Sequence, residues 1–571
     1  MWSDTIKQLI SDAAQKLYGP DFVMPNFSVE HPRDEKFGDY ASNIALLLAP
    51  IAKKAPLQIA QEIAEALPTN EGIESVEVVP PGFINFWLPQ AALRQELTQI
   101  KALADTYGTS QEGQNKPVIV EYSSPNIAKP FTIGHLRSTI IGDAVANLLE
   151  ATGWKVFRDN HLGDWGTQFG KQIYAIKTWG DESEIENAEQ PVRKLVELYV
   201  KFHEEAEKDP SLEDEGRAWF QRLEKGDPEA RRLWRKCIDW SWKEFNILYE
   251  LMGITFSEND GRGYGESYFE DKMEPIIQEL KDKNLIQESQ DAWLLFYPND
   301  ELPPLMILKK DGSTLYSTRD LATDKFRLEK YGQDVRIINE VGAEQSLYFQ
   351  QLYKAEELLG WMKPGQRVHI KHGMFRFADK KMSTRKGNVI WLETVLDEAI
   401  ERTGTLAENI PAEVAKQIGI GAVKWNDLKR SSHLDVVFDW DEILTMQGNS
   451  GPYVQYTYAR GRSVVAKAKE SMQIMPDFSG YEPNKEEVAL LRWLYRFGEA
   501  ISEAAQNLAP SGLSTYLYEL AQRYNAFYNA HSIAGADTDE AKAFRVELTE
   551  STTQVLKNGL KLLGIQAPEK V

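Results

Sequence analysis

Residues that could bind a phosphate group gather between positions 124 and 138. Gly134 lacks a side chain, so the backbone there can come close to a ligand. The side chains of Lys129, His135 and Arg137 add hydrogen-bond donors suited to an anion. A Gly-His pair by itself carries little information, and a helix-capping turn with a surface histidine is the simpler interpretation.

This segment lies between a predicted strand and a predicted helix. The apolar run 118–120 is typical of a buried parallel strand, and apolar residues recur at helical spacing from 140 to 149, until Thr152 and Gly153 end the pattern. Amides at a helix N-terminus carry partial positive charge, which stabilises a phosphate. A strand, a turn and a helix in this order predict a nucleotide site on an open α/β sheet.

A second basic segment, residues 381–388, contains Gly387 and could hold a triphosphate from the opposite side. Together the two segments resemble the signature motifs of the class I aminoacyl-tRNA synthetases, and the flanking sequence is similar to arginyl-tRNA synthetases. Three further blocks, at 160–170, 311–320 and 448–456, resemble that family in the same order. The resemblance therefore covers nearly the whole chain.

The expected fold is an α/β multidomain architecture. Apolar spacing and turn residues predict a small α/β N-terminal domain at 1–110, which the resemblance implies touches the D-loop of tRNA. Residues 111–405 are expected to form a class I nucleotide-binding, Rossmann-like catalytic domain with a parallel sheet and a charged helical insertion at about 181–290. Residues 406–571 have the pattern of an all-α helix bundle, which in the family binds the anticodon.

The resemblance implies an arginine–tRNA ligase. Such an enzyme activates L-arginine with ATP to arginyl-adenylate and pyrophosphate, then transfers arginine to the 3′-terminal ribose of tRNA(Arg). The protein's task is positioning and charge stabilisation, and Mg²⁺ bridges phosphate oxygens without a dedicated protein site. By resemblance the catalytic residues are Lys129, Thr132, His135, Lys381, Ser383 and Arg385, and the ATP-binding residues are Pro130, Ile133, Gly134, His135, Gly342, Glu344 and Met382.

Two positions depart from the class I pattern. Thr132 stands where the first motif usually has a histidine, and its hydroxyl can hydrogen-bond a phosphate but carries no charge. Thr384 stands where the second motif usually has a lysine. In arginyl relatives a lysine ahead of the first motif is thought to substitute, and Lys129 occupies that position. We therefore expect Lys129 to act in catalysis.

Arginine recognition requires carboxylates and neutral acceptors in one plane, because a guanidinium carries five donors. Glu121, at the end of the first predicted strand, and Asp320 are candidate carboxylates. Tyr316 lies four residues before Asp320, so both face one pocket if that segment is helical. With the positions that the resemblance adds, the arginine-binding residues are Glu121, Ser123, Asn126, His135, Tyr316, Asp320 and Gln345.

Aromatic residues are expected to serve two different purposes. The predicted helix at 453–460 offers tyrosines and an arginine, which suit stacking on single-stranded RNA, although core packing is the simpler interpretation of the spacing. The resemblance implies tRNA contacts by Phe83, Asn85, Tyr453, Gln455, Tyr456 and Arg460. In the insertion we instead expect core positions for Trp219, Trp234, Trp240 and Trp242.

Composition limits the classes of protein that fit. The net charge of -21 over 571 residues argues against indiscriminate nucleic-acid binding, but not against one specific RNA. The single cysteine, Cys237, excludes an internal disulfide and fits a reducing cytosol. No apolar run approaches the roughly 20 residues that a membrane helix needs, and no export signal is apparent. We expect a cytoplasmic monomer.

Two alternatives stay open. A cysteinyl-type synthetase would share the fold, but the absence of a zinc-binding cysteine set argues against it. An inactive RNA-binding relative is favoured only by Thr132 and is opposed by His135, Lys129 and Lys381. A P-loop ATPase is excluded, because Lys171 is followed by Gln172 rather than by a serine or threonine.

Overall fold

The computed structural model describes residues 2–19, 21–68, 72–289, 292–309, 314–377, 390–406, 410–470, 472 and 476–570. The chain separates into two compact units, each built from three stretches of sequence. The first unit comprises Met1–Gly108, Arg460–Ala500 and Glu519–Asn558, and the second comprises Thr109–Ala459, Ile501–Tyr518 and Gly559–Val571. Because the C-terminal helices are shared between the units, the expected three-domain division stays a prediction.

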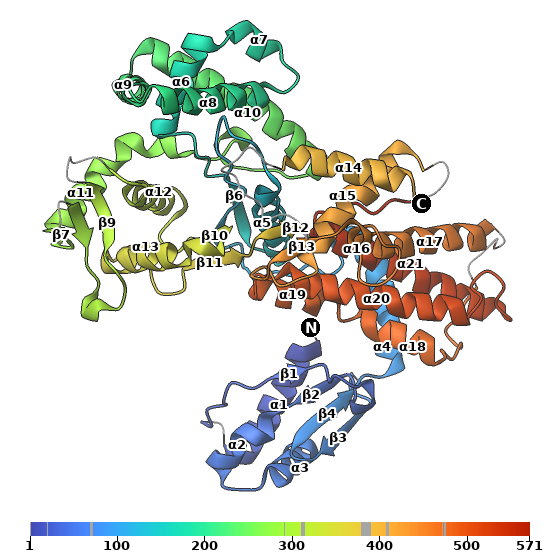
Figure 1. Cartoon of the computed structure of the whole chain (residues 1–571). Helices are drawn as coiled ribbons and strands as arrows, with labels where there is room; N and C mark the ends of the chain where they lie inside the picture. The colour runs from blue at the N-terminus through green and yellow to red at the C-terminus, as the bar shows by residue number, and fades with distance from the viewer. Residues whose placement is uncertain are drawn as a thin grey trace. The chain divides into compact units, whose positions relative to one another are not determined.

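A four-stranded parallel sheet forms the centre of the second unit, and it appears near the middle of Figure 1. Its order is β11 (Arg367–His372), β10 (Arg336–Gly342), β5 (Pro117–Glu121) and β6 (Lys155–Asp159). Every neighbouring pair is parallel. The buried residues Val118, Ile119 and Val120 confirm the predicted buried strand. The carboxyl ends of all four strands meet at one edge, where open α/β sheets bind ligands.

Helix α5 (Ile133–Ala151) follows β5 and leads back to β6. Its apolar residues are buried, since it packs between the sheet and the neighbouring helices. The helix ends where the sequence predicted, because the N–H and the hydroxyl of Thr152 both bond the carbonyl of Leu148 and Gly153 follows with φ +83°.

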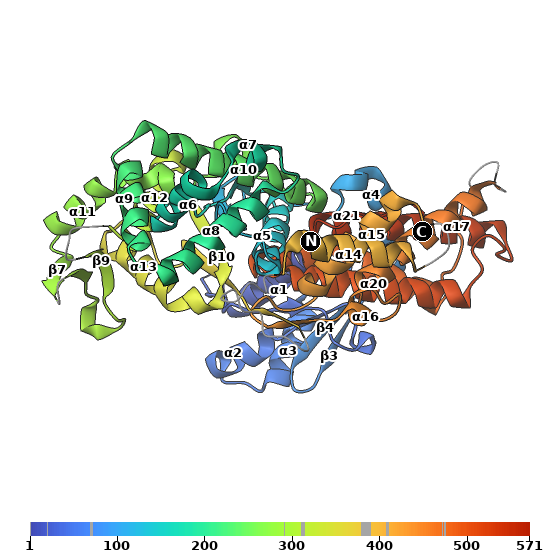
Figure 2. The same ribbon diagram turned by 45° about the horizontal axis from the view of Figure 1, so that its top comes forward.

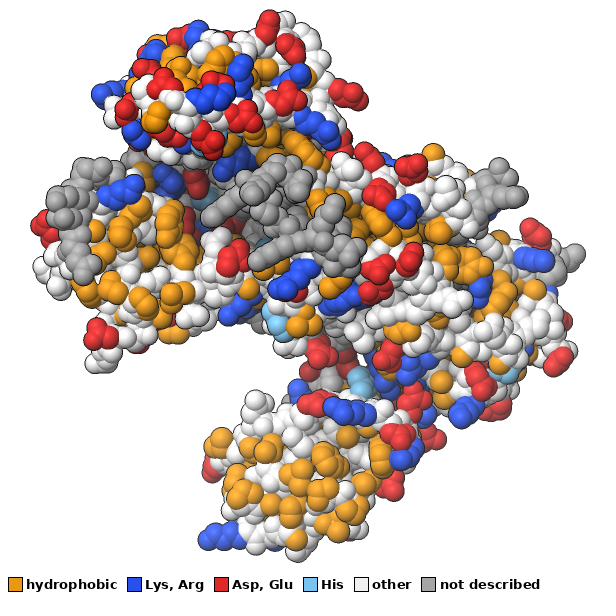
Figure 3. Space-filling model, viewed as in Figure 1, with side chains coloured by type: hydrophobic (Ala, Val, Ile, Leu, Met, Phe, Trp, Pro, Cys, Tyr) orange, Lys and Arg blue, Asp and Glu red, His pale blue; other side chains and the backbone are white. Residues whose placement is uncertain are grey.

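Five helices lie together beside the sheet in both ribbon views (Figures 1 and 2). They are α6 (Thr167–Trp179), α7 (Glu182–Asn187), α8 (Pro191–Lys208), α9 (Leu212–Glu224) and α10 (Pro228–Met252). Trp234, Trp240 and Trp242 are buried here, as predicted, while Trp219 is half-buried with Arg222 stacked over its ring. The surface of these helices mixes charges of both signs (Figure 3), because ion pairs such as Arg232–Glu182 link neighbouring helices.

A three-stranded antiparallel sheet, which the sequence did not predict, follows the insertion. It contains β7 (Ile286–Ser289), β8 (Ala292–Leu295) and β9 (Leu305–Lys309). This sheet shares a core with α11 (Met273–Asp282), α12 (Tyr316–Tyr331) and α13 (Ser346–Leu358). The helix α12 confirms that Tyr316 and Asp320 lie one turn apart on a helix.

From residue 406 onward the chain is helical, as predicted, apart from the short strand β13 (Val436–Phe438), which pairs with β12 (Phe375–Phe377). Within the second unit lie α14 (Leu392–Gly404), α15 (Ala412–Leu428) and α16 (Trp440–Ile443). Four longer segments contribute to the first unit or to both, namely α17 (Gly451–Glu470), α18 (Lys485–Leu494) with α19 (Phe497–Gln506), α20 (Pro510–Ala530) and α21 (Asp539–Leu562).

The first unit contains an antiparallel sheet in the order β1 (Val29–Glu30), β2 (Tyr40–Ser42), β4 (Phe83–Trp87) and β3 (Ser75–Val79). The predicted strand pair β3–β4 and the turn at 80–82 are confirmed. The helices α1 (Trp2–Tyr18), α2 (Ile44–Ala52) and α3 (Pro56–Ala66) pack against this sheet, whereas α4 (Gln90–Leu103) packs against α18.

In neither unit does a described helix have the length and apolar character needed to cross a membrane.

Candidate active site

The turn that leaves β5 holds three non-glycine residues in the left-handed region. The φ angles are 72° at Ser123, 45° at Ser124 and 57° at Ala128. Such conformations cost about 1–3 kcal/mol each, so the surrounding structure must hold them. The N–H of Ser124 donates to Oδ1 of Asn160 at 3.0 Å, and the N–H of Ala128 donates to Oγ of Ser241 at 2.9 Å. The first motif therefore begins on a fixed backbone.

His135 lies in the first turn of α5, and the backbone fixes its proton. Nδ1 accepts a hydrogen bond from the N–H of Thr132 at 3.0 Å and lies 3.1 Å from Oγ1 of Thr132. The hydrogen of the neutral ring is consequently assigned to Nε2. Burial lowers the pKa of His135 to about 4, and the charge of Lys129 acts in the same direction. At pH 7 the ring is neutral and offers Nε2–H as a donor.

The other phosphate candidates lie around the same helix end. Gly134 is exposed, Lys129 and Pro130 are half-buried, and Ile133 is buried. The N–H of Ile133 donates to the carbonyl of Ile390 at 3.1 Å. The structure thus brings Lys129, Gly134 and His135 together at a helix N-terminus, which is a favourable place for a phosphate.

The second motif cannot be placed in the same way. The candidate residues Lys381, Met382, Ser383 and Arg385 lie outside the described residues.

Gly342, Glu344 and Gln345 lie at the carboxyl end of β10, next to that of β5 in the sheet. A Cβ atom on Gly342 would lie 2.3 Å from Oε1 of Glu344, so a larger residue at this position would require the Glu344 carboxylate to move. Glu344 and Gln345 themselves are exposed. All three residues therefore border the edge that the first motif occupies.

Tyr316 and Asp320 lie one turn apart on α12, where Tyr348 from α13 joins them. The Tyr348 hydroxyl donates to the Asp320 carboxylate, and its ring lies 4.8 Å from that of Tyr316. Burial raises the pKa of Asp320, and His161 opposes that rise without cancelling it. The Asp320 side chain is 25% exposed, so this carboxylate remains open to a ligand.

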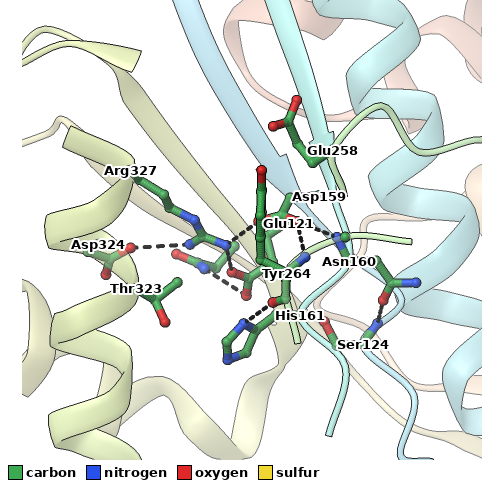
Figure 4. A network of polar contacts seen from close by, with 12 residues as sticks. Glu121, Ser124, Asp159, Asn160, His161, Glu258, Tyr264, Thr323, Asp324 and Arg327 are labelled. Carbon is green, nitrogen blue, oxygen red and sulfur yellow. Dashed lines mark hydrogen bonds and ion pairs between the residues drawn. The ribbon is translucent and has the colours of Figure 1, made fainter. Parts of the chain in front are cut away.

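Glu121 belongs to a buried network of charges, shown in Figure 4. Arg327 forms ion pairs with Glu121, with Asp159 at 2.8 Å and with Asp324 at 3.2 Å. Nδ2 of Asn339 donates to the second oxygen of Glu121 at 2.9 Å. Burial raises the pKa of Glu121, but the charges of Arg327 and His161 together with the hydrogen bonds from Arg327 and Asn339 lower it by more, and the net pKa lies below its ordinary value. Glu121 is therefore ionised and held by protein partners on both oxygens.

Ser123 and Asn126 connect the turn to its neighbours. Oγ of Ser123 lies 2.8 Å from the Tyr249 hydroxyl, and the side chain of Ser123 is buried. Asn126 forms a parallel bridge with Gly163, where a Cβ atom would lie 2.3 Å from Oδ1 of Asn126. Asn126 thus packs against the segment that carries His161.

Sequence reasoning gave no role to His161 or Arg327. Nδ1 of His161 lies 2.9 Å from the carbonyl of Tyr264, and Nε2 lies 3.8 Å from Oδ1 of Asp320. The block at 160–170 resembles a family motif, so the sequence does contain a signal for His161. Arg327 lies outside every motif, and its contact with Glu121 joins positions 206 residues apart.

The tRNA candidates divide into exposed and buried residues. Phe83 is 37% exposed, whereas Asn85 is 2% exposed and Gln455 is 0% exposed. Nε2 of Gln455 donates to the carbonyls of Gln417 at 3.0 Å and Gln566 at 2.7 Å. In this structure the side chains of Asn85 and Gln455 are inside the protein and do not present their amides to an RNA.

Tyr453, Tyr456 and Arg460 are half-buried and share one face of α17, since they are three, four and seven residues apart. The Arg460 guanidinium bonds Oδ1 of Asn525 at 3.2 Å and lies 5.2 Å from the centre of the Tyr528 ring. This face has the aromatic and cationic composition that stacking on RNA requires.

Comparison with known proteins identifies the family. Residues 96–440 match the model described as tRNA synthetases class I (R), catalytic domain. Residues 454–571 match the DALR anticodon binding domain, and residues 4–88 match the arginyl tRNA synthetase N terminal domain. The catalytic-domain match spans more than half of the chain, which places the chain in class I of the tRNA synthetases.

Relatives and solved structures agree with that class. The chain is 43% identical over 553 residues to a protein of Clostridium perfringens named arginine–tRNA ligase, covering 95% of this chain and 96% of that protein. A protein of the same name from Clostridium botulinum is 42% identical over 550 residues, with the same coverage of both chains. The alignment with the arginyl-tRNA synthetase structure from Thermus thermophilus covers 100% of both chains, with a TM-score of 0.83 and 24% identity. The alignment with the arginyl-tRNA synthetase structure from Plasmodium falciparum covers 100% of this chain and 99% of that chain, with a TM-score of 0.80 and 24% identity. The chain belongs to the arginyl-tRNA synthetase family.

Proposed function

We propose that this chain is an arginine–tRNA ligase, which activates L-arginine with ATP to arginyl-adenylate and pyrophosphate and then transfers arginine to the 3′-terminal ribose of tRNA(Arg). One observation supports this most strongly. Carboxylates suited to a guanidinium and a helix N-terminus suited to phosphate lie at the same edge of one parallel sheet. The relatives at 42–43% identity, named arginine–tRNA ligases, support the same conclusion.

In the first step the arginine carboxylate attacks the α-phosphate of ATP, and pyrophosphate leaves. The neutral His135 donates from Nε2 to a phosphate oxygen, and the amides at the start of α5 add their partial positive charge. Lys129, near this helix end, supplies the positive charge that Thr132 and Thr384 cannot. Lys381 and Arg385 are proposed to neutralise the departing pyrophosphate.

Mg²⁺ is proposed to enter this reaction with ATP. Across the described residues no group of three histidine, cysteine, aspartate or glutamate side chains is arranged to hold a metal ion. The ATP phosphates themselves would bind the cation, which neutralises their charge and leaves the protein to orient them.

Arginine recognition is assigned to the pocket beside α12. Asp320 accepts from the guanidinium, the exposed Tyr316 covers it, and Glu121 contributes negative charge while it stays paired with Arg327. A lysine ammonium could not satisfy these planar acceptors, so the site would reject lysine by leaving buried acceptors unpaired. Asn126 and Gln345 are proposed to orient the amino-acid end.

The second step needs bound tRNA. We assign RNA contact to Tyr453, Tyr456 and Arg460 on α17 and to Phe83 of the N-terminal domain, because their side chains are exposed or half-buried. A three-domain division at about residues 110 and 405, a monomeric state and a cytoplasmic location complete the proposal.

The test is charging of a tRNA(Arg) transcript with labelled arginine. Arginine should enter acid-precipitable tRNA only when ATP and magnesium are present, and labelled lysine should not. Tight binding of the transcript without any charging would instead support the inactive RNA-binding relative.

A further inference from the structure

His161 is placed among more negative than positive groups, which come from several elements. Glu121 comes from β5, Asp320 and Arg327 come from α12, and Glu266 comes from the short helix η4 (Glu266–Lys272). Asp164 lies on the same loop as His161 and interacts with it as well. Since Arg327 is also bound to two other carboxylates, its charge does not balance this cluster.

The ring of His161 is held in one orientation. Nδ1 lies 2.9 Å from the carbonyl oxygen of Tyr264, which can only accept, so Nδ1 carries a hydrogen. The N–H of Tyr264 in turn donates to Asp159 at 3.0 Å, which fixes the carbonyl (Figure 4). The remaining nitrogen, Nε2, is therefore the atom that gains or loses a proton, and it lies 3.8 Å from Oδ1 of Asp320.

The two protonation states of Nε2 have opposite effects on a guanidinium bound beside it. With its proton, the imidazolium places a positive charge beside Asp320 and Glu121, where the substrate guanidinium would bind. Without its proton, Nε2 presents a lone pair to the same space and can accept one of the guanidinium N–H groups. A guanidinium bound to Asp320 would lie close to an imidazolium at His161, and the two positive charges would repel each other.

We propose that His161 is a specificity-determining residue whose Nε2 proton is exchanged for the arginine side chain. This inference rests on the proposed function, because it describes how the charges in the proposed arginine pocket change when arginine binds. The proton leaves Nε2 for solvent as arginine binds, and the neutral ring then becomes an acceptor for the guanidinium. Burial by itself lowers the pKa of His161, but the charges of Glu121 and Asp320 raise it by more, so the net pKa lies above that of an ordinary histidine and Nε2 holds its proton more strongly before arginine arrives.

Proton release makes arginine binding depend on pH. While the imidazolium predominates, each pH unit of increase should tighten arginine binding by up to about tenfold, because one proton is released per arginine. The dependence should level off once His161 is neutral without arginine. A purely structural histidine would produce neither the slope nor the proton release.

The experiment is calorimetric titration of the full chain with L-arginine at pH 6.5, in several buffers of different ionisation enthalpy. The dependence of heat on buffer gives the number of protons released. We expect more than half a proton released per arginine for the wild type and close to none for His161→Asn, which retains an amide donor for the Tyr264 carbonyl. His161→Gln, which places an amide nearer to the Nε2 position, should give the same result, and His203→Asn in the helical insertion is the matched control that should still release the proton.

Three results would overturn the inference. Binding heat without proton release in the wild type would show that His161 is already neutral. Undiminished release in both His161 variants would assign the proton to a carboxyl group such as Asp320 or Glu266. No arginine binding together with no arginine-dependent ATP–pyrophosphate exchange would reject the proposed function and this inference with it, whereas normal exchange without proton release would reject the inference alone.

Discussion

Asp427 binds the guanidinium of Arg137 with both carboxylate oxygens, at 2.9 Å from Nε and 3.0 Å from Nη2. Arg137 belongs to the helix of the first motif and is 1% exposed, while Asp427 lies near the end of α15. The same guanidinium donates to the carbonyls of Leu434 at 2.7 Å and Ser432 at 3.0 Å. One buried cation thus ties the phosphate-binding helix to the segment that leads into β13.

Removing one partner of this pair should be costly. Asp427→Asn leaves the guanidinium buried without its paired carboxylate, so we expect a loss of about 3–5 kcal/mol of stability. Thermal unfolding of the variant measures this as a lowered Tm. Glu398→Gln, which breaks the exposed pair with Arg402, is the control and should cost no more than about 0.5 kcal/mol. Equal Tm values for the two variants would show that the Arg137–Asp427 pair does not stabilise the fold.

Asp320 is predicted to set the choice of amino acid. Asp320→Asn removes the charge but keeps an acceptor, so kcat/KM for arginine in ATP–pyrophosphate exchange should fall by at least about a hundredfold, and the discrimination against lysine should shrink. Asp334→Asn, at a side chain that is 90% exposed, serves as the control. If Asp320→Asn kept wild-type discrimination, guanidinium recognition would have to lie elsewhere.

The burial of Lys424 predicts that the stability of the protein depends on pH. Its ammonium is buried and donates to the carbonyls of Met252 at 2.5 Å and Gly564 at 2.7 Å, and burial lowers its pKa to about 8. The pKa in the unfolded chain is about 10.4, so between these two pH values the unfolded chain binds more protons and stability rises with pH. The contribution is up to about 1.4 kcal/mol per pH unit.

The measurement compares urea unfolding of wild type and Lys424→Met from pH 7 to pH 10. The free energy of unfolding of the wild type minus that of the variant should increase above pH 8, because the contributions of titratable groups common to both proteins cancel. A difference that stays constant across this range would mean that Lys424 keeps an ordinary pKa in the folded protein.

Neighbouring residues of α17 should respond differently to truncation. Tyr456→Ala removes a half-buried ring from the proposed RNA face, so tRNA(Arg) binding should weaken by roughly 1–3 kcal/mol, the usual loss for one stacked base. Gln455→Ala removes a buried amide that holds the carbonyls of Gln417 and Gln566, and it should lower the Tm. Filter binding and thermal unfolding of both variants separate the two effects. Weaker tRNA binding by Gln455→Ala at unchanged Tm would reverse this assignment.

The sequence predicted individual helices and strands best where apolar residues follow the periodicity of that element. The buried run before the first motif became β5, the helical spacing after it became α5, and the four-residue spacing of Tyr316 and Asp320 became one face of α12. Each of these depends on periodicity within a single element, which the sequence contains directly.

What the sequence could not predict are contacts between distant elements. Arg327 forms an ion pair with Glu121 because α12 packs beside the end of β5. Local sequence patterns predict neither the strand order nor this packing. The burial of Gln455 has the same cause, since the C-terminal segment at Gln566 covers it. The sheet β7–β9 was missed because its strands are short and follow a long helical insertion.

The central claim is that this chain forms arginyl-adenylate, and arginine-dependent ATP–pyrophosphate exchange tests it most directly. The assay is run with and without tRNA(Arg), and with lysine as the control amino acid. We predict exchange with arginine and none with lysine, and the comparison with and without tRNA shows whether the RNA completes the site. Absence of exchange with every amino acid, in the presence of measurable tRNA binding, would contradict the claim and leave an RNA-binding protein without ligase activity.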